Sequence, residues 1–102
     1  MPARRGAGAG AAPAELKQLR NLGPKSAAML SAAGIDSVDA LRALRAARAY
    51  VRVRRSTRGA SLNLLWALEG ALSDRPWQAV ARDDRLALLL QVETLDADPG
   101  TR

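Results

Sequence analysis

The sequence contains no cysteine and no histidine among its 102 residues. Thiolate and imidazole groups supply most nucleophilic, acid–base and transition-metal chemistry, so a disulfide framework, a zinc site and a cysteine or histidine enzyme are excluded. No apolar run approaches the ~20 residues that a membrane-spanning helix needs, and residues 1–14 lack the apolar core of a signal peptide. We therefore expect a cytoplasmic protein that makes no contact with a membrane.

Convergent carboxylates are also lacking. The two acidic pairs are Asp83-Asp84 and Asp96/Asp98. Neighbouring residues of a helix point to different faces, and the second pair lies close to the end of the chain, so neither pair predicts a two-metal site. Ser26 has no histidine or other base to activate it. We expect no enzymatic activity, no catalytic residue, no cofactor and no bound metal.

Basic residues outnumber acidic ones, and they are concentrated early in the chain. The net charge is +6, from 16 lysines and arginines against 10 acidic residues. Residues 1–58 hold 12 basic residues against 3 acidic ones, whereas residues 59–102 hold 4 against 7. This asymmetry predicts a basic face that favours anionic partners. The alternative is compositional, because GC-rich codons supply alanine, arginine and glycine together.

The length fits a single domain, whose core can form without metal or disulfide support. Residues 1–13 are rich in alanine and glycine and too poor in large apolar residues to order themselves, so they predict a flexible basic tail. We expect the domain over residues 14–95 and a frayed end over residues 96–102. Apolar residues recur at helical spacing and no strand pattern is present, which predicts an all-α bundle of five to six short helices.

Glycine and proline mark the ends of the expected helices. The helices are predicted over residues 15–20, 24–33, 38–44, 46–55, 62–72 and about 83–95. Gly34 suits the left-handed position after a helix, with Ile35 folding back onto Leu30. Ser37 and Ser61 are expected to cap the helices that follow them.

The segment Asn21–Ser26 predicts a tight turn between two helices. Pro24 suits the first position of a helix, and Gly23 can take a backbone angle that other residues avoid. We therefore predict that Gly23→Val lowers the stability by more than ~1 kcal/mol. Lys25 and Ser26 would lie beside the free N–H groups of the new helix, which is a favourable place for a phosphate.

The run Asn21-Leu22-Gly23-Pro24-Lys25-Ser26, followed by Gly34-Ile35 and Ala40-Leu41, resembles a helix-hairpin-helix element. With Ala49-Tyr50, Ser61-Leu62-Asn63-Leu64-Leu65, Ala67-Leu68-Glu69-Gly70-Ala71-Leu72 and Trp77, the region from Leu19 to about Leu90 resembles the C-terminal domain of the TfoX-type competence regulators. That resemblance implies a small all-helical fold and a role with DNA. Because those regulators typically carry a further N-terminal domain, the chain matches a stand-alone version.

Two positions depart from the patterns that the resemblance implies. A helix-hairpin-helix turn commonly has glycine where this chain has Asn21, and the family usually has glycine after the equivalent of Leu44, where this chain has Arg45.

The first functional hypothesis is a regulatory module that binds the phosphates of double-stranded DNA. The hairpin would contribute Lys25, Ser26 and backbone N–H groups near Leu22 and Gly23. The helix over residues 46–55 would add a stripe of arginines. Its expected contacts are Arg48, Arg52 and Arg55, with Arg20 and Arg58 as flankers. Nothing in this set reads base edges, so binding would show little sequence preference. The alternative for the stripe is a solvated helix face.

The second hypothesis is a protein-interaction or oligomerisation domain without DNA contact. It rests on the leucine-rich final helix and on Trp66, which lies off the main leucine stripe and could contact a partner or the core. Trp77 is expected to pack into the bundle, and Gly70 to admit a neighbouring helix. Asn63 is expected to bond the local backbone rather than a ligand. Only three aromatic residues are present, which disfavours single-strand binding by base stacking.

Overall fold

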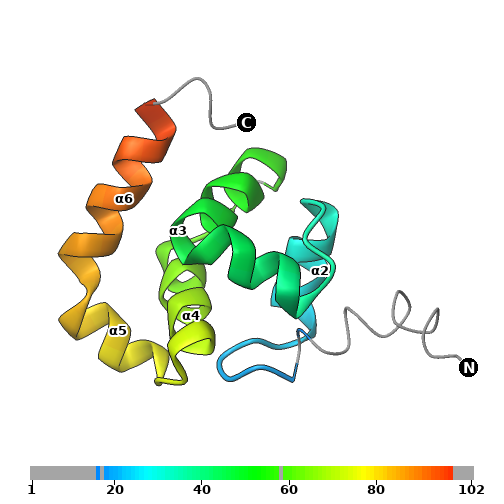
Figure 1. Ribbon diagram of the computed structural model, residues 1–102, viewed down its shortest axis with the longest axis horizontal. Helices are drawn as coiled ribbons and strands as arrows, with labels where there is room; N and C mark the ends of the chain where they lie inside the picture. The colour runs from blue at the N-terminus through cyan, green and yellow to red at the C-terminus, as the bar shows by residue number, and fades with distance from the viewer. Residues whose placement is uncertain (1–15, 17, 58, 98–102) are drawn as a thin grey trace, which may run out of the picture.

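The computed structural model describes residues 16, 18–57 and 59–97, and this part of the chain is helical without any strand. The helices are α2 (Pro24–Ala32), α3 (Val38–Ser56), α4 (Leu62–Ser73), α5 (Trp77–Asp83) and α6 (Arg85–Ala97). Figure 1 shows α3 and α4 at the centre, α2 on one flank and α6 on the other, with α5 leading from α4 to α6. The predicted all-α bundle is confirmed.

Turns lead from Leu16, which is helical, into α2. Residues 18–20 are turn residues, and the Leu19 and Leu22 N–H groups donate to the Leu16 and Leu19 carbonyls, both at 3.1 Å. Each bond joins residues three apart, which is tighter than the α-helical spacing. The helix expected over 15–20 is therefore wrong for residues 18–20. Glu15, Lys17 and the tail over 1–13 lie outside the described residues.

The end of α2 confirms the predicted stop. Gly34 has a φ of 84°, and its N–H donates to the Ser31 carbonyl at 2.9 Å. The Ile35 N–H donates to the Leu30 carbonyl at 2.8 Å, and both side chains are fully buried. This pair of bonds is the Schellman arrangement, in which the apolar contact seals the helix end.

Helix α3 contains the two helices that were expected separately. Its cap is confirmed, because the Ser37 hydroxyl accepts from the Ala40 N–H at 3.0 Å. Arg45 takes φ 70° and ψ 170°, which is not helical, and bends α3 at the expected boundary. Beyond the bend α3 packs against α4, and Ala46, Tyr50 and Val53 are buried, all at most 3% exposed.

Helix α4 packs against both α3 and α5, so a wide arc of its surface is buried. Leu65 and Leu68 are fully buried, and Trp66 is 5% exposed. Trp66 is therefore a core residue, and the alternative of a partner surface at this position is wrong. Ser61 precedes the helix, but its side chain makes no capping hydrogen bond, contrary to expectation.

The final helix begins at Arg85, two residues after the start expected at Asp83. Asp83 ends α5, whereas Asp84 precedes α6 and accepts the Leu88 N–H with its carbonyl at 3.0 Å. Trp77 begins α5 and is 38% exposed, so it packs only in part and is not the buried anchor that was predicted.

Candidate nucleic-acid interface

The sharp turn of the hairpin is made at Asn21 and not at Gly23. Asn21 has a φ of 71°, in the left-handed region that asparagine tolerates better than most residues. Gly23 has φ −124° and ψ −170°, which is extended backbone open to any residue, and a Cβ there would meet nothing within 4 Å. The prediction of an unusual angle at Gly23 is wrong, and asparagine replaces the expected first glycine.

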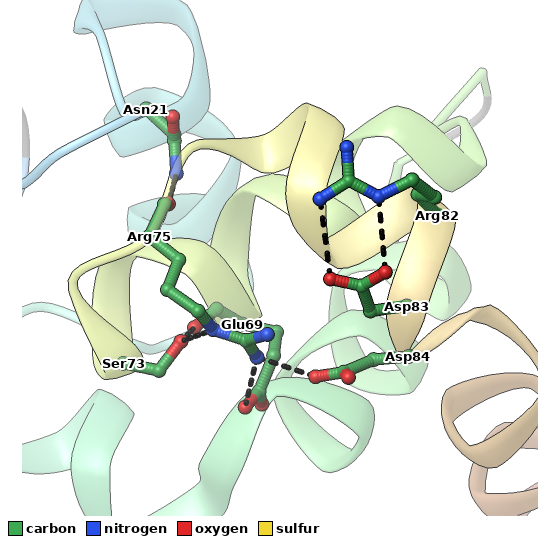
Figure 2. A network of polar contacts seen from close by, with 7 residues as sticks. All are labelled: Asn21, Glu69, Ser73, Arg75, Arg82, Asp83 and Asp84. Atoms are coloured by element: carbon green, nitrogen blue, oxygen red, sulfur yellow. Dashed lines mark hydrogen bonds and ion pairs between the residues drawn. The ribbon is translucent and has the colours of Figure 1, made fainter.

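The side chain of Asn21 ties the hairpin to the turn between α4 and α5. Its Nδ2 donates to the Arg75 carbonyl at 2.8 Å, and its Oδ1 accepts the Trp77 N–H at 3.2 Å. Figure 2 shows Asn21 reaching the backbone of Arg75. A Cβ at Gly70 would lie 2.3 Å from Asn21 Nδ2 and 2.4 Å from the Arg75 oxygen. Gly70 therefore admits this turn, and not a neighbouring helix as predicted.

A cluster of polar side chains around the Arg75 guanidinium also stabilises the turn between α4 and α5 (Figure 2). Arg75 Nε donates to Ser73 Oγ at 3.0 Å, and Nη2 contacts Asp84 Oδ2 and, at 3.7 Å, Glu69 Oε2. Burial raises the pKa of Glu69, although the positive charge of Arg75 opposes that shift. Arg82, beside this cluster, donates to Asp83 and lowers its pKa. The cluster fixes where α5 begins, and therefore where Trp77 lies.

The first turn of α2 presents hydrogen-bond donors to solvent. Lys25 is exposed and Ser26 is half-buried. The first backbone bond of α2 runs from the Ala27 N–H to the Gly23 carbonyl at 2.9 Å, so the N–H groups of Lys25 and Ser26 have no acceptor within the helix. The N–H of Leu22 is already donated to Leu19, and its side chain is buried. Donors for an anion are thus concentrated at Lys25 and Ser26.

These donors line a groove that was not foreseen from the sequence. The groove has a volume of about 600 Å³ and lies between the starts of α2, α4 and α5, with Lys25, Ser26, Ser61, Asn63 and Trp77 among its lining residues. The expected local bond of Asn63 is absent: its exposed side chain makes no hydrogen bond within the described residues. The hairpin sequence predicted the donors at Lys25 and Ser26. The opposite wall of the groove comes from Ser61, Asn63 and Trp77, which follow α3 in the chain and approach the hairpin only in the folded structure.

The arginine stripe of α3 faces another part of the molecule. Arg48 and Arg52 are exposed, and Arg48 lines a separate groove between α3 and α6. Arg55 pairs with Asp96 of α6 at 3.8 Å, and Arg54 contacts the same carboxylate. The structure therefore brings Lys25 and Ser26 together but directs Arg48 and Arg55 towards α6. Of the flankers, Arg20 lies 3.8 Å from Asp74, and Arg58 is outside the described residues.

Two negative findings apply to the described part of the chain. It holds no group of three or more metal-ligating side chains. None of its helices has both the length and the apolar character that crossing a bilayer requires.

Fold and groove together define a small all-helical domain with hydrogen-bond donors at the start of α2. The model of one family, the TfoX C-terminal domain, matches residues 12–92, and the chain belongs to that family. Comparison with curated proteins and with solved structures gave no match.

Proposed function

We propose that the chain is a non-enzymatic DNA-associated module that holds duplex phosphates at the start of α2, in a regulatory role of the kind that the family name suggests. The observation that carries the proposal is the exposed first turn of α2. There the Lys25 ammonium and two N–H groups without helical acceptors share one groove with the start of α4. Both helix starts carry the positive end of a helix dipole, which favours an anion.

The arginines of α3 provide a second and weaker contribution. Arg48 and Arg52 add positive charge without an ion pair in the described structure, whereas the charge of Arg55 is partly compensated by Asp96. Long-range attraction to a duplex depends on summed charge, so these residues support association even though they do not line the hairpin groove. We expect a Kd on the order of 10⁻⁴ to 10⁻⁶ M near physiological salt, with little sequence preference.

The experiment is a salt series of duplex-DNA binding followed by fluorescence anisotropy, from about 50 to 200 mM salt. Lys25→Ala and Arg52→Ala should each weaken binding and flatten the slope of log K against log salt by about one. Arg82→Ala is the matched control, because it removes the same charge from the exposed surface of α5. Arg4→Ala/Arg5→Ala tests the N-terminal segment separately.

Each alternative outcome has a distinct meaning. If the Arg4/Arg5 variant abolishes all salt-dependent binding and Lys25→Ala changes nothing, the folded domain does not hold the DNA. If Arg82→Ala reduces the slope as much as Lys25→Ala, binding follows net charge and the groove has no special role. If the wild type fails to bind duplex at about 50 mM salt, the DNA proposal is wrong.

A further inference from the structure

The outer side of α6 carries apolar side chains that no described part of the chain covers. Leu86 is 71% exposed and Leu90 is 53% exposed. They are four residues apart and therefore share one side of the helix. Leu88 and Val92, at 4% and 5% exposure, occupy the opposite side and pack into the core. Figure 1 shows α6 at the edge of the molecule. The exposure of Leu86 and Leu90 places their shared side, which we call the Leu86/Leu90 stripe, on the surface.

The stripe continues into an apolar groove. Leu90 lines a groove of about 460 Å³ between α6 and α3, together with Ala43, Leu44, Ala47 and Leu95; Arg45, Arg48, Gln91 and Thr94 complete its lining. Two separated exposed leucines would need no explanation, since single apolar residues are common on surfaces. A stripe that merges with an apolar groove forms a contiguous patch, which is typical of an interaction surface.

Charges at the two ends of the stripe indicate what covers it. Arg85 precedes Leu86 and Glu93 follows Leu90; both are exposed, and neither has a hydrogen bond or ion pair within the described residues. They are eight residues apart, or about 12 Å along the helix. The stripe is therefore positive at one end and negative at the other. A second α6 running antiparallel and centred near Leu89 would place each Arg85 beside Glu93 of the second copy.

We propose that the outer face of α6 binds a second copy of this chain as an antiparallel helix pair. A two-fold symmetric interface requires a self-complementary surface, and the Arg85-to-Glu93 polarity around an apolar centre meets that requirement. Leu86 of each copy would lie near Leu90 of the other. Each copy contributes only one helix face to the pairing, so the dimer should be weak, with a dissociation constant on the order of 10⁻⁵ M. The dimer proposal does not rest on the DNA proposal, although Arg48 of α3 lines the same groove as Leu90.

Sedimentation velocity over a concentration series tests the proposal. Arg85→Glu and Glu93→Arg should each raise the dissociation constant by at least about tenfold. In the symmetric pair, position 85 of each copy lies beside position 93 of the other, so either substitution creates two contacts between like charges. An equimolar mixture of the two variants should recover association, since the heterodimer restores both opposite-charge pairs. The double variant Arg85→Glu/Glu93→Arg should recover association with itself.

Leu90→Gln should also weaken the dimer, whereas Leu62→Gln is the matched control on α4, where Leu62 is 38% exposed. All the charge variants are at exposed positions, and circular dichroism melting checks that each remains folded. A wild type that stays monomeric at about 1 mM overturns the proposal. Single variants that weaken association without recovery in the mixture overturn the antiparallel pairing.

Discussion

Arg45 holds a backbone conformation that costs the fold free energy. Its φ of 70° and ψ of 170° fall in a region that is essentially restricted to glycine, with a strain of about 1–3 kcal/mol for other residues. The family resemblance also places glycine at this position. We predict that Arg45→Gly raises the free energy of unfolding by about 1 kcal/mol, less than the full strain because glycine also makes the unfolded chain more flexible. Urea unfolding monitored by circular dichroism measures the change.

Arg48→Gly is the matched control, because it makes the same replacement three residues further along α3 where the backbone is helical. It should lower the free energy of unfolding by about 1 kcal/mol. If both variants change the stability in the same direction, the conformation at Arg45 is not strained.

At the scale of the elements, α4 lies so close to the turn that follows it that no side chain fits at Gly70. Alanine in place of glycine inside a helix ordinarily adds about 1 kcal/mol of stability. Gly70→Ala should instead lower it by at least about 1 kcal/mol, because the new methyl group would be only 2.4 Å from the Arg75 backbone oxygen. Thermal and urea unfolding both measure this effect.

Gly23 provides the comparison for Gly70. Its extended angles and open surroundings accept a side chain, so Gly23→Ala and Gly23→Val should each change the stability by less than about 1 kcal/mol. This replaces the larger loss that the sequence had suggested for Gly23→Val. A Gly70→Ala variant as stable as the wild type would show that the turn can move away from α4.

The sequence predicted some helix ends that are determined by nearby residues, although the equally local cap expected at Ser61 is absent. The stop at Gly34 and Ile35 and the cap at Ser37 depend on bonds that span three to five residues, and both are confirmed. Gly23, Gly70 and Trp77 were interpreted wrongly because their environments depend on Asn21, which acts on a turn more than fifty residues away. For the same reason the hairpin donors were predicted, but the groove that contains them was not.

At the scale of the whole molecule, α6 reduces the positive charge of α3. Asp96 pairs with both Arg54 and Arg55. We predict that Asp96→Asn strengthens duplex-DNA binding and steepens its salt dependence by up to about one, because it removes one negative charge from beside Arg54 and Arg55. Stability should change little, since exposed ion pairs contribute about 0–1 kcal/mol. Anisotropy titrations in a salt series measure the first effect.

Asp83→Asn is the control for Asp96→Asn, because it removes an acidic group of the same kind from the pair with Arg82 on α5. An equal gain in affinity from the two variants would indicate a response to net charge alone. A larger gain from Asp96→Asn would link the end of α3 to the DNA.

The bonds of Asn21 also determine when the hairpin can be completed during synthesis. Its two partners lie 54 and 56 residues further along the chain. A ribosome-bound chain that has not yet emerged as far as Trp77 can form the local stop of α2, but it cannot fix Asn21 in its left-handed conformation through these bonds. The hairpin is therefore synthesised before the turn that completes it and gains these contacts only afterwards, which makes its final geometry dependent on a late, non-local step of folding.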